Sequence, residues 1–187
     1  MVTLLVVSGA THSVDESIAN AARGLHWGPM RSLFRATSAI GELGAVQALV
    51  GGAVVIALLV VSRRAGYLML LGALASVLNL GIRLLIPRDG PGATEHVVFD
   101  PSRGHSYPSG HAVLFTWVTF LVAAGISPRI PAQLRYVVWA LAAAVTAVAC
   151  IGRVWVGAHW PSDVVGGLLL GLGWSAFVLW LPQRWVR

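Results

Sequence analysis

Two short motifs place two imidazoles, a guanidinium and a carboxylate beside apolar segments of this chain. The first is Pro-Ser-Gly-His at residues 108–111, and the second runs from Arg153 through His159 to Asp163. An imidazole next to a serine hydroxyl and a glycine amide, with a second imidazole close to an acid, supplies the groups needed for phosphoryl transfer without a metal. The motifs therefore point to chemistry on a phosphate group.

The second motif contains its own candidate nucleophile. Asp163 follows His159 by four residues, and Pro161 and Ser162 between them are typical of a helix start. A carboxylate so placed can accept a hydrogen bond from one ring nitrogen and leave the other nitrogen free to attack. Asp163 also fits a first-turn acid that stabilises a helix N-terminus, so the pair by itself leaves both interpretations open.

Several groups around these motifs are suited to holding an anion. Ser109 can cap a helix that opens at His111, so that backbone amides such as that of Gly110 point outward at its positive end, although the tetrapeptide is also an ordinary turn and cap. Arg83 and Arg88 flank the end of an apolar segment. A guanidinium group can bind two phosphate oxygens at once, in a bidentate arrangement. A topological role for either arginine, or pairing of Arg88 with the adjacent aspartate, competes with this interpretation.

The composition indicates a membrane protein. The chain has 187 residues, of which 57% are hydrophobic and 11% charged, and its mean hydropathy is +0.77, outside the usual range for soluble domains. All 13 basic residues are arginines, and they lie singly or in pairs between apolar runs, which argues against a nucleic-acid surface. The single cysteine, Cys150, excludes an intrachain disulfide and a thiolate metal site.

Continuous apolar runs without strict alternation predict an all-α, polytopic transmembrane bundle in one domain, residues 1–187. The sequence divides it into an N-terminal segment, 1–43, and a helix bundle that carries the motifs, 44–182. Five membrane spans are predicted, at about 44–62, 65–82, 111–126, 136–152 and 163–181.

The N-terminal segment is harder to assign. Its first ten residues are apolar but too short to span a bilayer, so they are either an anchor or the end of a further span. Within 11–43, Ser13 is a candidate helix cap. An apolar side is formed by Ile18, Ala21, Ala22, Leu25 and Trp27. An amphipathic helix in the membrane interface and a helix packed on the bundle are both compatible with this pattern.

The charge distribution orients the predicted spans. Arginines in the connections 62–64 and 127–135 and in the tail assign these three segments to the cytoplasmic side. The connections 83–110 and 153–162 then lie together on the other side. They hold both motifs, so we expect the two histidines to face one another at the extracytoplasmic end of the bundle.

With these motifs in this order, the chain resembles the type 2 phosphatidic acid phosphatase superfamily over about residues 40–180. Its three signatures are lysine-x6-arginine-proline, Pro-Ser-Gly-His and Ser-Arg-x5-His-x3-Asp. The second is intact, and the third has Gly152 in place of the leading serine. In the first, Arg83 replaces the lysine, Gly90-Pro91 replaces arginine-proline, and Arg88 lies two residues early. The family's bundle has six spans, so the resemblance implies that the short apolar start of this chain is a remnant of the first span.

The resemblance implies a two-step phosphoryl transfer without a metal or other cofactor. His159 would attack phosphorus and form a phosphohistidine, Asp163 would hold its ring, and His111 would protonate the leaving oxygen and later activate water. The resemblance assigns the phosphate oxygens to five residues: Arg83, Arg88, Ser109, Gly110 and Arg153.

A site at the outer interface suits a phosphate head with an apolar tail. The expected substrate is a membrane lipid phosphate, with polyprenyl diphosphate, phosphatidylglycerol phosphate and phosphatidic acid as candidates, and the expected location is the cell membrane. A noncatalytic lipid-phosphate binding or transport protein is the alternative from another class. A metal-dependent hydrolase using His105, His111 and His159 is a further alternative, although their spacing matches no standard ligand motif. The membrane spans argue against a related vanadate-bearing oxidase. The sequence determines neither the lipid nor the oligomeric state.

Overall fold

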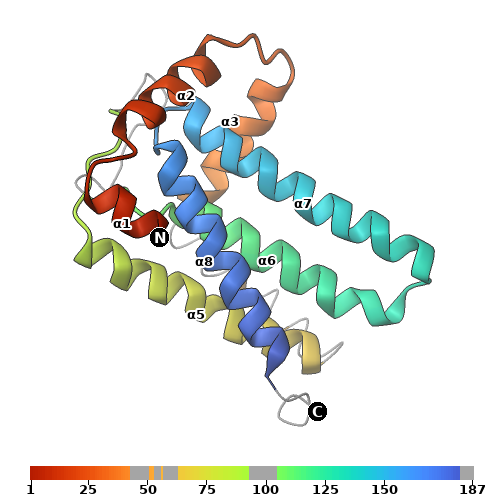
Figure 1. Cartoon of the computed structure of the whole chain (residues 1–187). Helices are drawn as coiled ribbons and strands as arrows, with labels where there is room; N and C mark the ends of the chain where they lie inside the picture. Colours follow the sequence, from red (N-terminus) through yellow and green to blue (C-terminus); the bar gives the residue numbers. More distant parts are fainter. Residues whose placement is uncertain (43–50, 53–55, 57–62, 93–104, 182–187) are drawn as a thin grey trace.

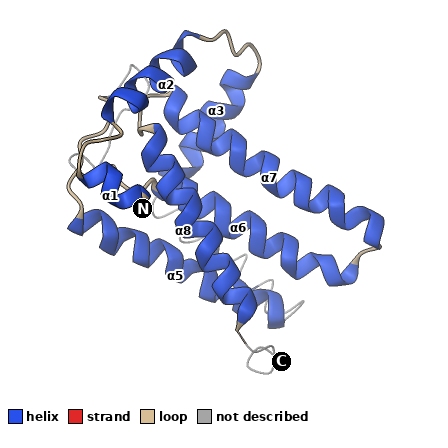
Figure 2. Cartoon of the chain, in the orientation of Figure 1, coloured by secondary structure: helices blue, strands red, loops and turns tan. Residues whose placement is uncertain are grey.

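The computed structural model describes residues 1–42, 51–52, 56, 63–92 and 105–181, and all regular elements within them are helices (Figures 1 and 2). The all-α prediction is therefore confirmed for these residues. In chain order the elements are α1 (Val2–Val7), α2 (His12–Gly24), α3 (Met30–Glu42), α5 (Arg63–Leu85), α6 (Gly110–Ile126), a short 3-10 helix η1 (Ser127–Arg129), α7 (Ala132–Trp155) and α8 (Pro161–Trp180).

Four of these helices are long and apolar enough to cross a membrane. Within the described part of the chain, the candidate spans are Gly66–Leu85, Gly110–Arg129, Ala132–Trp155 and Pro161–Trp180. They confirm four of the predicted spans, because each contains most of the apolar run that predicted it. Apart from residues 51–52 and 56, the remaining predicted span, 44–62, lies outside the described residues, as does the predicted boundary between residues 43 and 44.

Helix α6 occupies the centre of the bundle and packs against α5, α7 and α8 (Figure 1). Val113 and Leu121 on α6 are buried in the core, which they share with residues of α5 and α8. Gly167 and Gly171, one helical turn apart on α8, face α6 at very short range. A Cβ atom added to Gly167 would lie 2.6 Å from the backbone oxygen of Ser109. Small residues thus let the start of α8 approach the start of α6, as is common in membrane helix pairs.

Helices α2 and α3 cover one end of this bundle. Helix α3 packs on α7, where the backbone and side chain of Phe34 lie against Gly152, and α2 packs on α7 and α8. The buried side of α2 carries Asp15 and Ala19, whereas Ile18 and Leu25 are exposed. The predicted apolar side is therefore divided. Ile18, Ala21 and Leu25 are exposed, whereas Ala22 packs on the core and Trp27 contacts Phe34.

The predicted cap of α2 was also wrong. The helix begins at His12 with Thr11 at the N-cap position, two residues before Ser13. Because the side facing the bundle was taken to be apolar, the pattern gave no indication that an aspartate lies there. This packing brings Asp15 to the end of the bundle that carries the motifs.

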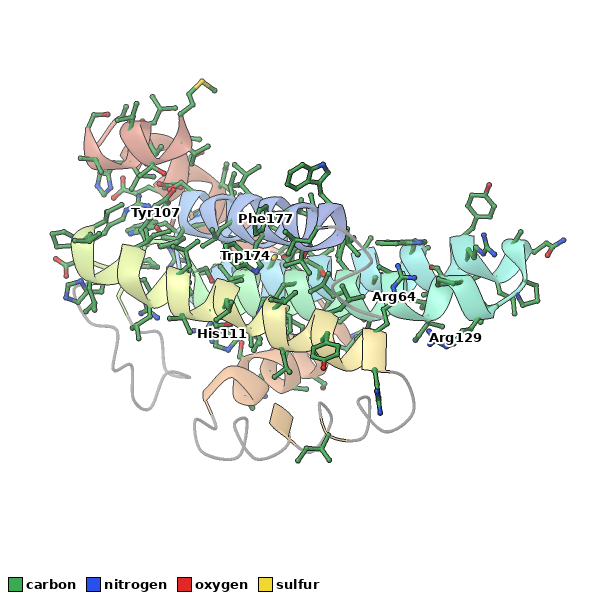
Figure 3. The ribbon with its side chains drawn as sticks, turned by 90° about the horizontal axis from the view of Figure 1, so that it is seen from below. Arg64, Tyr107, His111, Arg129, Trp174 and Phe177 are labelled. Atoms are coloured by element: carbon green, nitrogen blue, oxygen red, sulfur yellow. The ribbon has the colours of Figure 1, made fainter. Side chains whose placement is uncertain are left out.

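The two ends of the bundle differ in character. Arg64 and Arg129, from two of the basic connections, lie toward one end, and Tyr107, directly before the Pro-Ser-Gly-His motif, lies toward the other (Figure 3). At the Tyr107 end the two motif-bearing connections touch, because the indole Nε1 of Trp160 donates to the Asp89 carbonyl at 2.9 Å. The predicted convergence of these connections at one end is confirmed.

The close approach of α8 to α6 predicts a strong asymmetry between two glycines of the same helix. We expect Gly167→Ala to lower the free energy of unfolding by about 1–3 kcal/mol, because its Cβ meets a backbone oxygen that cannot rotate away. The matched control is Gly173→Ala, where no atom lies within 4 Å of the added Cβ. Thermal unfolding in detergent measures both, and equal melting temperatures for the two variants would contradict the close packing described here.

Candidate active site

The second motif forms the turn from α7 into α8. Asp163 lies in the first turn of α8, and its Oδ2 accepts a hydrogen bond of 2.9 Å from the backbone amide of Trp160. The same oxygen lies 3.7 Å from Nδ1 of His159, slightly longer than a hydrogen bond. Such contacts are often long in free enzymes and shorten when substrate binds. The arrangement directs one ring nitrogen toward the acid, as the spacing predicted.

His159 is almost completely buried, with 3% of its surface exposed. Burial lowers the pKa of this imidazole, and the positive charges of Arg153 and Arg83 act in the same direction, against the raising effect of Asp163. The folded protein therefore favours a neutral His159, which is the form that can act as a nucleophile. Arg153 itself is 5% exposed, in the last turn of α7.

The first motif brings the second imidazole to the same end of the bundle. His111 lies in the first turn of α6, and its Nε2 is 3.0 Å from the backbone oxygen of Ser38 on α3. A carbonyl oxygen only accepts hydrogen bonds, so Nε2 must carry the hydrogen of this contact. The charges of Arg153 and Arg83 act on His111 as well as on His159. The structure thus groups both histidines and both arginines.

Ser109 and Gly110 form the start of α6. Ser109 is fully buried at the N-cap, where its hydroxyl oxygen faces the Ala112 amide at 3.5 Å, and its own amide donates to the Asp163 carbonyl at 3.0 Å. The predicted cap is confirmed. A Cβ atom added to Gly110 would lie 3.7 Å from the Arg83 guanidinium, so this arginine from α5 reaches the first turn of α6.

Arg83 is fixed by the chain segment that leads into the first motif. Its Nε donates to the His105 carbonyl at 2.7 Å, and Nδ1 of His105 lies 2.8 Å from the Arg83 carbonyl. His105 is therefore a partner of Arg83 and of the end of α5. Among the described residues, no three His, Cys, Asp or Glu side chains are grouped as metal ligands.

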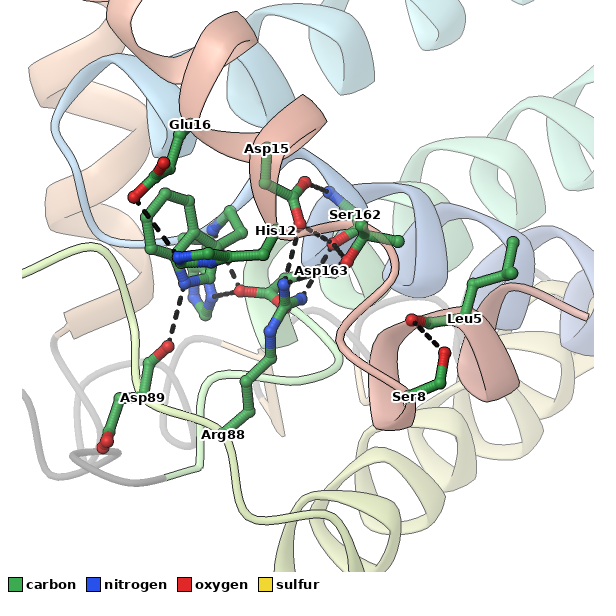
Figure 4. A network of polar contacts seen from close by, with 12 residues as sticks. Leu5, Ser8, His12, Asp15, Glu16, Arg88, Asp89, Ser162 and Asp163 are labelled. Atoms are coloured by element: carbon green, nitrogen blue, oxygen red, sulfur yellow. Dashed lines mark hydrogen bonds and ion pairs between the residues drawn. The ribbon is translucent and has the colours of Figure 1, made fainter.

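Arg88 lies in a polar network with two buried carboxylates (Figure 4). One terminal nitrogen donates to Asp163 Oδ1 and, at 2.8 Å, to the Ser162 hydroxyl. The other donates at 2.7 Å to Asp15 Oδ2 and at 3.3 Å to the Thr11 hydroxyl. Arg88 is close to the site, as predicted, but in this structure its terminal nitrogens bind protein oxygens.

Asp15, Ser162 and Ser38 belong to this site although the sequence motifs did not predict them. Asp15 Oδ1 accepts from the Ser162 amide at 2.8 Å, and Asp15 Oδ2 accepts from the Ser162 hydroxyl at 2.6 Å. For Asp15 the scarcity of acids was a signal, since the chain has only seven, but it does not indicate which side of α2 is buried. Ser38 contributes its backbone oxygen, which every residue type has, so the sequence could not predict this contact.

Known proteins that resemble this chain identify its family. The sequence model of the PAP2 superfamily matches residues 61–187, so this chain belongs to that superfamily. An undecaprenyl-diphosphatase of Sulfolobus acidocaldarius is 38% identical over 76 residues, which are 40% of this chain and 32% of that protein. The bacitracin transport permease protein BcrC of Bacillus licheniformis is 36% identical over 80 residues, 43% of this chain and 35% of that protein. The chain spans about a third of the length of these curated relatives.

A solved structure shares the fold of nearly the whole chain. The crystal structure of a transmembrane PAP2-type phosphatidylglycerolphosphate phosphatase from Bacillus subtilis matches with a TM-score of 0.73 and covers 96% of this chain and 94% of that one. The two sequences are 23% identical, so this likeness concerns the fold. Together with the four apolar helices, it identifies a multi-pass membrane protein.

The buried neutral His159 predicts a pH-dependent loss of stability. An unfolded histidine takes up a proton near pH 6.5, whereas folded His159 does so only at lower pH, since its pKa is lowered. Between the two pKa values the unfolded state binds more protons, so stability falls as pH drops below about 6.5. We expect His159→Asn to reduce the difference in melting temperature between pH 7.5 and pH 5.5.

The matched control for this prediction is His26→Asn, because His26 is exposed and its surroundings change little on unfolding. It should leave the difference in melting temperature at the wild-type value. A His159→Asn variant with an unchanged difference would show that His159 is not held neutral by the fold.

Proposed function

We propose that this protein hydrolyses the phosphomonoester or diphosphate head group of a membrane lipid, without a metal, through a phosphohistidine on His159. The observation that carries the proposal is the position of this buried imidazole. It has Asp163 behind one ring nitrogen, and two arginines act on it electrostatically. Membership of the PAP2 superfamily supports the same chemistry.

In the first step, Nε2 of His159 attacks phosphorus in line as the bond from phosphorus to the leaving oxygen breaks. Positive charge develops on the ring, and Asp163 at Nδ1 stabilises it. His111 gives a proton to the leaving oxygen, so the dephosphorylated lipid departs as an alcohol or as a monophosphate. His111 lies in the first turn of α6 and His159 in the turn that leads into α8, so the packing of α8 on α6 brings the two histidines to the same end of the bundle.

In the second step, water attacks the phosphohistidine. His111 takes a proton from the water, the bond from phosphorus to Nε2 breaks, and its electron pair returns to the ring of His159. Because Nε2 of His111 donates to the Ser38 carbonyl, Nδ1 is the nitrogen assigned to proton exchange in both steps. Inorganic phosphate is the second product.

The phosphate oxygens are assigned to Arg83, Arg153, the Ser109 hydroxyl and the Gly110 amide. Arg83 and Arg153 are supported most directly, because their charges act on both histidines. Preorganised donors of this kind are each worth about 3–4 kcal/mol of barrier in comparable sites. Arg88 stays a predicted phosphate ligand. To bind phosphate, its guanidinium would have to release one of the two carboxylates that it now contacts.

A lipid substrate at the extracytoplasmic surface of the cell membrane fits the architecture. The site lies at the end of the bundle away from Arg64 and Arg129, and basic residues mark the cytoplasmic side. An apolar tail can lie along the exposed faces of the helices while the phosphate head reaches His159. Polyprenyl diphosphate, phosphatidylglycerol phosphate and phosphatidic acid are the proposed classes, and the names of two relatives support the first two.

A noncatalytic role in lipid-phosphate binding or transport is the second candidate. It is favoured by the name of one relative, a bacitracin transport permease protein. Such a protein would bind the same lipids at the same arginines but release no phosphate. The presence of both histidines at one end of the bundle, with Asp163 beside His159, favours the enzyme.

The proposal is tested by phosphate release from purified protein in detergent, with a panel of the three lipid classes. We expect release that persists with a chelator, is inhibited by vanadate, and falls at least about a thousandfold in His159→Ala, because the nucleophile is lost. Acid-labile label from a radioactive lipid phosphate should remain on the wild-type protein after rapid quenching and be absent from the variant.

His26→Ala is the matched control, since it removes an exposed imidazole far from the motifs in sequence, and it should keep wild-type activity. Release that survives His159→Ala would contradict the phosphohistidine. Release abolished by the chelator would point to a metal-dependent hydrolase, and lipid binding without release would favour transport.

A further inference from the structure

Asp15 is a buried acid that no step of the proposed reaction uses. It is 2% exposed, on the side of α2 that faces the bundle. It lies outside residues 61–187, the part that matches the superfamily. Both of its oxygens are engaged at the catalytic end of the bundle, one by the Ser162 amide and the other by Arg88 and the Ser162 hydroxyl.

The Arg88 guanidinium connects Asp15 to the catalytic acid. Its two terminal nitrogens divide between Asp15 and Asp163, and the side chain is only 14% exposed. Behind Asp163, on its other oxygen, lies His159. The four side chains therefore form a continuous chain of charged and polar contacts from α2 to the nucleophile.

The charges in this chain have a direct consequence for the reaction. An arginine bound to Asp163 alone would neutralise it and weaken its effect on the positive charge that develops on His159. A second carboxylate on the same guanidinium offsets this, and the three groups together carry one net negative charge. Burial alone would raise the pKa of Asp15, but hydrogen bonds from Ser162, Arg88 and Thr11 outweigh it and lower the pKa, so Asp15 is ionised.

We propose that Asp15 is a positioning residue for the reaction: by sharing Arg88 with Asp163, it holds that carboxylate in place and keeps it negative enough to stabilise the ring of His159. The inference rests on the proposed function, in which His159 is the nucleophile. It gives helix α2 a role in catalysis that its amphipathic pattern did not indicate.

The test is Asp15→Asn, which keeps an oxygen for the Ser162 amide and removes the charge. We expect kcat to fall about 10- to 100-fold with KM within about threefold, because the change acts on the developing charge and not on lipid binding. The acid limb of the kcat/KM profile should move to lower pH by about half a unit, since protonated His159 loses a stabilising negative charge. The lipid is the one hydrolysed fastest in the panel.

The matched control is Glu16→Gln on the same helix. Glu16 is exposed and lies 3.3 Å from the exposed His12, so its loss should change neither kcat nor the pH profile. Asp15→Glu, which restores the charge on a longer side chain, should recover part of the lost kcat. A wild-type kcat for Asp15→Asn, or a rise in KM alone, would overturn the proposal.

A double-mutant cycle with Arg88→Gln separates positioning from a purely structural role. If Asp15 acts through Arg88, Asp15→Asn should lower kcat in the wild-type background and cause no further loss in the Arg88→Gln background. Equal losses in both backgrounds, or a loss without a shift of the acid limb, would show an independent structural effect and overturn the proposal. If Asp15→Asn alone does not fold, the double variant is compared with the Arg88→Gln variant. A lower kcat in the double variant than in Arg88→Gln would then also overturn the proposal.

The outcomes are distinguishable from failure of the proposed function. Activity that survives His159→Ala contradicts the phosphohistidine whatever Asp15 does. Activity that requires His159 but is unchanged in Asp15→Asn contradicts only the positioning role.

Discussion

The end of the bundle that carries both motifs depends on the first turn of α8, where the carboxylate of Asp163 is completely buried. One of its oxygens accepts the Trp160 amide and faces His159, and the other accepts Arg88. A buried charge is stable only where its oxygens are satisfied. The turn from α7, the connection after α5 and the N-terminal helix α2 must therefore all come together around it.

The bundle supplies the rigidity that this arrangement needs. Helix α6 lies between α5, α7 and α8, and the glycines of α8 let its start approach Ser109 until backbone contacts form. His111 then lies in the first turn of α6, and His159 lies in the short turn that leads into α8, beside it. Arg83 and Arg153 come from the last turns of α5 and α7, so the same packing brings their charges beside both imidazoles.

The covering helices extend the site beyond the part that matches the superfamily. Helix α3 offers the Ser38 carbonyl to His111, and α2 offers Asp15 to Arg88 and Ser162. Both contacts act on groups that carry the proposed chemistry. The outward side of α2 keeps its apolar residues exposed, as Ile18 shows, which suits a helix with one side on the bundle and one side toward lipid.

The sequence by itself determined the four described spans, the convergence of both motifs at one end, and the cap at Ser109, because hydrophobic length and local helix signals fix these features within a few residues. Only the tertiary structure decided that Arg88 binds Asp15 and Asp163, that Ser38 holds His111, and which side of α2 is buried. The contacts of Arg88 with the two aspartates and of His111 with Ser38 join residues 73 to 75 positions apart, and those of Asp15 with Ser162 join residues 147 positions apart. They depend on how the helices pack. The sequence pattern of an amphipathic helix does not distinguish a buried aspartate from an exposed one, because the arginine that binds the buried carboxylate comes from a distant segment.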